Sequence, residues 1–342
     1  MISFPQKYRK IGIDVGSYSV KAVALEKGPL NKRPTLSCAI EYLPSPTPSP
    51  SQLLESICNA LKKLNLPVSK VNISLWGREV VTRYVCFPLM RRSEIINALR
   101  LEWDKHISFK LDEVIWDFQP LDIVNDPVKG KQRLDLLVAA KKEFLEQQIH
   151  LLKEAEIEPD IIETNVVSLV NAFNFLYPSQ PPHSLLALVN IGELATNLVI
   201  LKDGMPRFSR NILFGGRDIT HLIAQKKHID FLKAQELKHS FKGEDEEIAS
   251  VINNGLESLV NEVNLSLEYL KKELGGEVET IYICGGSLHL YGIEEFLKEI
   301  LQVRIERWKS DDKFRFASGN FRKEWEECFS ELAVALGSAL AI

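Results

Sequence analysis

Two stretches of the chain share one pattern of apolar and polar positions. In Lys10–Leu25 an apolar strand, a tight polar turn and a second, alternating strand follow one another. A shift of 176 positions without gaps places this stretch on a similar one in the second half. The matched pairs are Asp14 with Asn190, Gly16 with Gly192, Val23 with Val199, Leu25 with Leu201, and Gly28 with Gly204. Such self-similarity indicates a duplicated unit, so we predict two related β-hairpins.

The sequence after the first hairpin predicts the rest of a first sheet and one helix. Pro34–Tyr42 alternates as a third strand, and Val71–Leu75 reads as a buried strand of the same sheet. Pro44–Ser51 is a short proline-rich connector, which favours a stiff spacer. The helix that follows has one apolar face, and Ser49 with Gln52 predicts a capping box at its start.

Residues 78–155 have a different pattern, which predicts a compact α+β unit inserted in the first half. The unit begins with a strand at Arg78–Phe87, and a helix capped by Ser93 follows it. The remaining elements expected here are the strands Val114–Leu121 and Leu134–Ala140 and the amphipathic helix Lys142–Ala155.

The second half predicts a bridging helix, a second sheet and several helices that cover it. Pro159–Tyr177 reads as the helix that connects the two repeats. The pair Gly215-Gly216 stands between a strand and a helix capped by Asp218. The other elements expected are strand Pro206–Leu213, the mostly helical Asp230–Lys272 with a solvated acidic loop at Gly243–Glu247, a strand, Gly-Gly turn and helix in Ile281–Leu297, and a hydrophobic helix at Phe329–Ile342.

Composition fits a two-lobed globular protein and excludes several classes. The 342 residues exceed one ordinary core, and 45% hydrophobic with 26% charged residues is typical of a soluble chain. A net charge of −4 gives no argument for nucleic-acid binding. The five scattered cysteines lack any CxxC and indicate buried free thiols in a reducing compartment. With neither a signal peptide nor a membrane span in the sequence, we expect a cytoplasmic protein.

The duplicated turns are the candidate for chemistry. Gly16 and Gly192 allow close approach to the backbone, and exposed N–H groups in such turns suit phosphate oxygens. Each turn alone is compatible with an ordinary hairpin. Two copies, each followed by a further glycine-containing turn, favour a phosphate held between two lobes. The sequence has no GxxxxGK[ST] or GxGxxG motif and no spacing that supports a Ser/His/Asp triad.

Five segments follow one another along the chain, and their order is informative. They are the hairpin with Asp14-Val15-Gly16, a helix near Glu163, the hairpin with Asn190-Ile191-Gly192, Gly215-Gly216 and Gly285-Gly286. This order resembles the nucleotide site of the actin, Hsp70 and sugar-kinase superfamily. The resemblance implies an α/β, actin-like (ribonuclease H-like) fold with two lobes that bind ATP and Mg²⁺ between them. It assigns the cofactor to Asp14, Gly16, Ser17, Lys21, Asn190, Gly192, Gly215, Gly216, Glu262, Gly285, Gly286 and Ser287, the metal to Asp14 and Asn190 through water, and a candidate catalytic role to Glu163.

The inserted unit narrows the resemblance. RLEWDKHISFKLDEVIWDFQPL (Arg100–Leu121) and LLVAAKKEFLEQQIHLLKEAEIEPDIIE (Leu136–Glu163) resemble the PilM family of type IV pilus assembly proteins, relatives of FtsA. The family implies a first lobe of residues 1–77 and 156–184, an inserted, partner-binding subdomain at 78–155, a second lobe at 185–328 and a C-terminal helix at 329–342. Its implied partners are the cytoplasmic N-terminus of a PilN-like inner-membrane protein, which would hold the chain at the membrane, and other platform components; homo-oligomerisation stays open.

Four positions depart from the superfamily pattern. The second phosphate loop usually begins with Asp, and the bridging helix usually offers Asp where this chain has Glu163. Asn190 in the loop, and Asn264 and Leu265 where arginines are usual, predict weak or absent ATP hydrolysis. Two alternative functions stay open: a nucleotide-free assembly protein of a type II secretion platform, and a small-molecule kinase of the superfamily. An extended partner peptide that pairs with a strand edge of residues 78–155 is the binding mode we expect.

Overall fold

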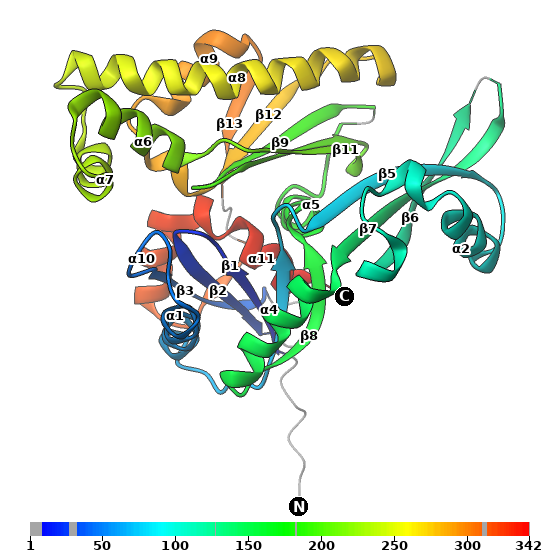
Figure 1. Cartoon of the computed structure of the whole chain (residues 1–342), viewed down its shortest axis with the longest axis horizontal. Helices are drawn as coiled ribbons and strands as arrows, with labels where there is room; N and C mark the ends of the chain where they lie inside the picture. The colour runs from blue at the N-terminus through cyan, green and yellow to red at the C-terminus, as the bar shows by residue number, and fades with distance from the viewer. Residues whose placement is uncertain (1–8, 27–32, 127, 182, 310–312, 342) are drawn as a thin grey trace, which may run out of the picture.

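The computed structural model describes residues 9–26, 33–126, 128–181, 183–309 and 313–341. The chain forms two lobes, one above the other in Figure 1, with a smaller unit that projects to one side. The strands are β1 (Arg9–Val15), β2 (Ser19–Glu26), β3 (Thr35–Tyr42), β4 (Lys70–Leu75), β5 (Val80–Pro88), β6 (Val114–Asp126), β7 (Gly130–Lys141), β8 (Glu158–Thr164), β9 (Leu185–Ile191), β10 (Thr196–Lys202), β11 (Met205–Ile212), β12 (Thr280–Cys284), β13 (Arg304–Arg307) and β14 (Arg315–Phe316). The helices are α1 (Pro50–Lys63), α2 (Arg92–Leu101), α3 (Trp103–His106), α4 (Lys142–Glu154), α5 (Asn165–Leu176), α6 (Gly216–Lys227), α7 (Phe231–Ser240), α8 (Glu246–Leu274), α9 (Ile293–Leu301), α10 (Gly319–Cys328) and α11 (Ala333–Leu340).

The two large sheets repeat one strand arrangement. The first has the order β14-β3-β2-β1-β4-β8 and the second the order β11-β10-β9-β12-β13. In each, an antiparallel hairpin is joined by a parallel strand, β4 beside β1 and β12 beside β9. The two predicted hairpins and the duplication are therefore confirmed. Gly28, the last glycine of the first repeat, lies outside the described residues.

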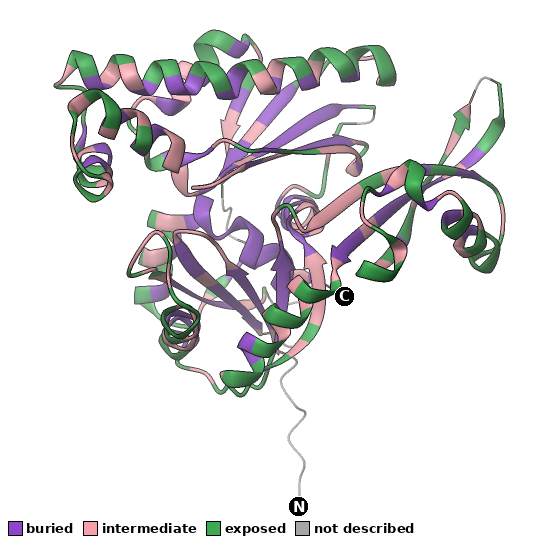
Figure 2. Ribbon diagram, in the orientation of Figure 1, coloured by how far each residue is buried: buried purple, intermediate pink, exposed green. Residues whose placement is uncertain are grey.

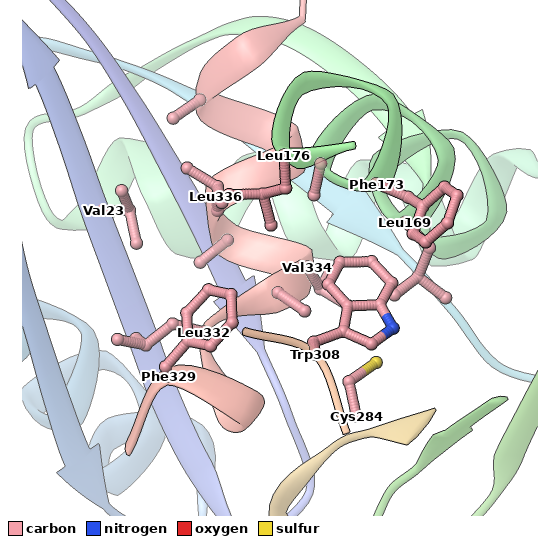
Figure 3. Close-up of a cluster of buried hydrophobic side chains, with 14 of the residues drawn as sticks. Val23, Leu169, Phe173, Leu176, Cys284, Trp308, Phe329, Leu332, Val334 and Leu336 are labelled. Carbon is pink, nitrogen blue, oxygen red and sulfur yellow. The ribbon is translucent and has the colours of Figure 1, made fainter. Parts of the chain in front are cut away.

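Helices α5 and α11 fill the space between the two sheets. Their apolar side chains form one core with the inner faces of both sheets, in which Phe173, Leu336 and Trp308 are buried (Figure 3). The helices cross closely because Gly337 of α11 has no side chain: a Cβ there would lie under 3.0 Å from the backbone of Ser168 in α5. The predicted C-terminal helix thus packs on the core, and it links the two lobes.

The inserted unit is smaller than predicted. The three-stranded sheet β5-β7-β6 carries α2 and α3 on one face and has a hydrophobic core of its own. Helix α4 instead packs its buried Leu151 and Leu152 with α1 and the first sheet, so it belongs to the first lobe. The predicted cap at Ser93 is wrong, because α2 begins after Arg91, and the helix is interrupted at Glu102.

Two boundaries in the second half also differ from the prediction. The chain returns to the first sheet before residue 328, since β14 pairs with β3 and Glu324 of α10 accepts the Ile40 N–H at 3.0 Å. Pro159–Tyr177 is not one helix, because Glu158–Thr164 forms strand β8 beside β4. Four helices, α6 to α9, cover the outer face of the second sheet. Asp245 caps α8, so Glu246 and Glu247 of the predicted acidic loop belong to this helix. Buried residues concentrate in the sheets and between the lobes (Figure 2).

Candidate functional site

A cleft of about 720 Å³ lies between the two lobes, where both duplicated hairpins turn. The first lobe and the C-terminal segment contribute residues from the β1–β2 turn and from the stretch before α11. The second lobe contributes the β9–β10 turn, the start of α6, α7 and the turn after β12. Of the residues predicted for the cofactor, those in the lining are Asp14, Gly16, Ser17, Lys21, Asn190, Gly192, Gly216, Gly285, Gly286 and Ser287.

The turn of the first hairpin carries an ion pair. Gly16 N donates to Ser19 O at 3.1 Å and closes the turn. Asp14 and Lys21 face each other across the β1–β2 pair, and Lys21 Nζ lies 3.2 Å from Asp14 Oδ2. Both side chains are at least 88% buried, with 12% and 9% exposed. A cation and a carboxylate are thus held at fixed positions on the cleft wall.

The second hairpin has the same backbone but neutral side chains. Gly192 N donates to Ala195 O at 3.0 Å, the counterpart of the bond in the first turn. The positions of Asp14 and Lys21 are taken by Asn190 and Asn197, whose amide groups lie 3.4 Å apart. The duplicated geometry therefore has one charged and one uncharged copy.

Two glycine pairs pack directly against this second turn. Gly216 N donates to Gly192 O at 3.0 Å, and Ser287 Oγ donates to the same oxygen at 2.8 Å. A Cβ on Gly215 would lie 2.5 Å from Gly192 O. Gly285 has φ +106, which favours glycine, and a Cβ there would lie under 3.0 Å from Ile191 O. Glycines therefore allow three chain segments to converge at the cleft.

Two predicted residues lie away from the cleft, and Gly215 adjoins it without lining it. Glu163 lies in strand β8, one residue before its end, and not in the helix that was predicted. Its carboxylate accepts hydrogen bonds from Ser168 Oγ at 2.6 Å and Asn171 Nδ2 at 3.2 Å. Burial raises the pKa of Glu163 to about 7. Glu262 lies on α8 and pairs with Arg210 at 2.5 Å.

Sequence reasoning missed a buried ion pair in the cleft wall. Lys238 of α7 donates to Gly216 O at 2.8 Å and lies 3.5 Å from Glu193 Oε2. Burial raises the pKa of Glu193 and lowers that of Lys238, and the attraction between the two groups opposes both effects. Glu193 directly follows Gly192 of the predicted phosphate turn, so its position at the cleft could have been predicted. Lys238 lies in a long helical stretch that has no motif, so its position could not.

Aromatic and histidine side chains line the cleft across both lobes. Tyr18 of the first hairpin and His239 of α7 make an edge contact with ring centroids 5.6 Å apart. Burial and the nearby Lys238 lower the pKa of His239. His289 Nε2 lies 2.9 Å from Glu331 Oε1, next to the start of α11. These pairs join the second lobe to the first lobe and to the C-terminal segment.

The donor set suits a magnesium-bound triphosphate better than a metal alone. Within the described ranges, no cluster of three or more His, Cys, Asp or Glu side chains could hold a metal. Mg²⁺ commonly keeps several waters and uses one or two carboxylates together with phosphate oxygens. Asp14, the two lysines and the glycine turns fit such a group.

An apolar groove of about 260 Å³ adjoins the cleft. Helices α1 and α4, the end of β4, the first hairpin turn and the connector before α1 form its walls. Arg217 of the second lobe reaches its edge, where its guanidinium donates to Pro46 O at 2.8 Å. Gly16, Ser17, Trp76 and Leu194 line both the groove and the cleft. The two sites therefore share a wall.

Comparisons with known proteins agree with this architecture. A family model described as type IV pilus assembly protein PilM matches residues 12–342. The solved structure of a PilM–PilN type IV pilus biogenesis complex contains a chain that is 25% identical, with a TM-score of 0.82 and 98% of each chain covered.

Two more distant structures are similar in fold alone. The ethanolamine utilization protein EutJ from Carboxydothermus hydrogenoformans is 14% identical, with a TM-score of 0.58 over 98% of this chain and 90% of that one. MreB5 of Spiroplasma citri, solved with ADP, is 14% identical, with a TM-score of 0.53 over 98% and 96%.

These likenesses confirm the actin-like fold predicted from the duplicated hairpins. In the part of the chain that the structure describes, no helix has the length and apolar content needed to cross a membrane. The family match covers almost the whole chain, including the inserted unit. The chain therefore belongs to the PilM family of type IV pilus assembly proteins.

Proposed function

We propose that this chain is a nucleotide-responsive scaffold of a type IV pilus or type II secretion-like assembly platform. It binds ATP between its lobes and the cytoplasmic N-terminal segment of a PilN-like inner-membrane protein beside them, so it works at the cytoplasmic face of that membrane. The observation that carries the proposal is the convergence of both hairpin turns and Gly285–Ser287 on one cleft. The similar chain solved in a PilM–PilN complex supports the partner.

The phosphates would lie between the two hairpin turns. Lys21 and Lys238, each paired with one carboxylate of the cleft wall, are the cations that would face the phosphates. Asp14 would hold Mg²⁺ through water, and the ion would neutralise phosphate charge. Gly286 and Ser287 would leave room for the adenosine, as the resemblance to the superfamily implies.

The same geometry supports binding more than turnover. Phosphoryl transfer depends on groups that position the nucleophile and stabilise developing charge. Asn190 takes the place of the second carboxylate and bonds to the neutral Asn197. Glu163 is the carboxylate that could replace the one missing at Asn190. It bonds to Ser168 and Asn171 instead and does not line the cleft. We therefore propose that hydrolysis is slow or absent.

The partner segment would occupy the apolar groove. Its walls are side chains of α1 and α4 such as Leu53, Phe144 and Leu152, which suit an apolar peptide. The predicted site was a strand edge of the inserted unit; the edge formed by β5 faces β11 of the second lobe, where Tyr84 lies beside Ser209. We therefore assign the peptide to the groove beside α4, whose walls are apolar.

Point variants test the groove. Leu53→Glu places a carboxylate in the apolar wall, so the N-terminal peptide of the cognate PilN-like protein should bind at least tenfold more weakly in fluorescence anisotropy. Leu101→Glu, at a side chain that is 88% exposed on the inserted unit, is the matched control. Equal loss in both variants, or in neither, would place the peptide elsewhere.

Titration calorimetry with Mg-ATP tests the cleft. The wild type should bind one ATP per chain, and Gly286→Trp should abolish binding, because the indole would occupy the cleft. Gly319→Trp is the control, since a Cβ there meets open space at the start of α10. ATP binding that is undiminished in folded Gly286→Trp excludes this loop as the adenosine site. A wild type that binds no nucleotide would favour the nucleotide-free assembly protein, and rapid phosphorylation of a small molecule would favour the kinase.

A further inference from the structure

The proposed function gives Lys238 a role toward the phosphates and leaves its partner Glu193 without one. Both side chains line the cleft, and both are largely buried, with exposed fractions of 6% for Lys238 and 11% for Glu193. A carboxylate at this place acts against a polyanionic ligand, and like charges brought together are a common means of rejecting the wrong ligand. Glu193 is therefore a candidate for a residue that selects among the forms of the nucleotide.

The carboxylate of Glu193 is held against the start of α6. The Glu193 backbone O accepts the Arg217 N–H at 2.8 Å, which ties the second hairpin turn to the first residues of this helix. A Cβ on Gly216 would lie 2.5 Å from Glu193 Oε2 and 3.2 Å from Lys238 Nζ, so both charged groups pack on this glycine. The pair is therefore part of the cleft wall and not of its exposed rim.

The charges that face Glu193 come from two helices. Burial raises the pKa of Glu193, the cations Lys238 of α7 and Arg217 of α6 lower it, and Asp218 of α6 adds to the rise. The Arg217 guanidinium donates to Pro46 O in the groove and does not line the cleft. Lys238 and Glu193 together therefore present no net charge to the cleft, whereas Lys238 alone would present a positive one.

The negative charge of Glu193 also acts on the opposite wall of the cleft. Tyr18 lines that wall in the first hairpin turn. Burial raises the pKa of the Tyr18 hydroxyl, and the carboxylates of Glu193 and Glu331 raise it further. The space between the two turns, where the phosphates would lie, is thus within reach of the Glu193 charge.

We propose that Glu193 makes the cleft selective for nucleotide whose phosphate charge is neutralised by Mg²⁺, an inference that rests on the proposed ATP site. Because Glu193 offsets the charge of Lys238, the second turn attracts bare phosphate only weakly. Mg²⁺ binds phosphate oxygens and cancels part of their charge, so Mg-ATP is repelled less by the carboxylate. Metal-free ATP keeps its full charge, and repulsion between like charges is strong in a largely buried site.

Titration calorimetry of the full chain with ATP, once in excess Mg²⁺ and once in EDTA, tests the proposal. Glu193→Gln keeps the size of the side chain and an acceptor for Lys238 but removes the charge. Metal-free ATP should bind this variant about tenfold more tightly than the wild type, and Mg-ATP only about threefold more tightly. Glu236→Gln, at an exposed residue of α7 outside the cleft lining, removes the same charge and should leave both affinities unchanged.

The ratio of the two affinities decides the result. A ratio of metal-free to Mg-bound affinity that is the same in Glu193→Gln and the wild type overturns the proposal, because Glu193 would then only hold Lys238 in place. Loss of ATP binding in folded Glu193→Gln overturns it as well. A failure of the proposed function gives a different pattern, in which neither the wild type nor the variant binds ATP with or without Mg²⁺, and this removes the role of Glu193 together with the site.

Discussion

The buried carboxyl of Glu163 predicts a stability change with pH that can be measured. Glu163→Gln keeps the size of the side chain and removes its titration. In the folded chain burial raises the pKa of Glu163 from 4.5 to about 7, although Ser168 and Asn171 donate hydrogen bonds that act in the opposite direction. In the unfolded chain the carboxyl titrates near its ordinary value.

The sign and size of the effect follow from linkage. Below pH 4.5 the carboxyl is protonated in both states, so the raised pKa costs nothing. As the pH rises through 4.5 and toward 7, the unfolded chain loses its proton first, and the folded state loses stability relative to it. A rise in pKa from 4.5 to about 7 corresponds to roughly 3 kcal/mol when the change is complete.

Urea denaturation at pH 5 and pH 8 measures this difference. The free energy of unfolding of Glu163→Gln should rise by about 2–3 kcal/mol relative to that of the wild type between pH 5 and pH 8, because the wild type loses stability over this range and the variant does not. Glu158→Gln is the control, because Glu158 lies in the same strand with its side chain 74% exposed. A relative stability of Glu163→Gln that does not change with pH would refute the reasoning.

Two further outcomes are expected. Gly337→Ala should lower the free energy of unfolding by about 3 kcal/mol, because the new methyl group would overlap the Ser168 backbone; a variant as stable as the wild type in urea would show that α5 and α11 can separate. Asn190→Asp should raise the rate of ATP hydrolysis in a phosphate-release assay, while Asp14→Ala should lower nucleotide affinity about 10–100-fold; a wild type that hydrolyses ATP as fast as Asn190→Asp would contradict the role given to Asn190.

The local pattern was enough to predict the duplicated core. Alternating apolar positions and turn glycines at a fixed offset define both hairpins, and the β1–β2 and β9–β10 pairs confirm them. The capping box of Ser49 and Gln52 is also confirmed, because both of its bonds are local. Such features need only neighbouring residues to form, so sequence alone indicates them.

Features that depend on distant contacts were not predicted. Strand β8 is short and runs directly into α5, and its strand conformation is stabilised by parallel pairing with β4, far away in sequence. The return of β14 to β3 involves two residues and leaves no periodic signal. Lys238 enters the cleft because α7 packs beside α6, which no motif in its own segment indicates.

The central claim is that the chain is a scaffold whose partner binding responds to nucleotide. Because the groove and the cleft share a wall, this coupling can be measured directly. The dissociation constant of the PilN-like N-terminal peptide should be determined with and without saturating Mg-ATP. Because Gly16, Ser17, Trp76 and Leu194 line both sites, bound nucleotide should change the peptide affinity by about fivefold or more, and the peptide should change ATP affinity by the same factor. Equal peptide affinities with and without ATP, when both ligands bind, would contradict the account.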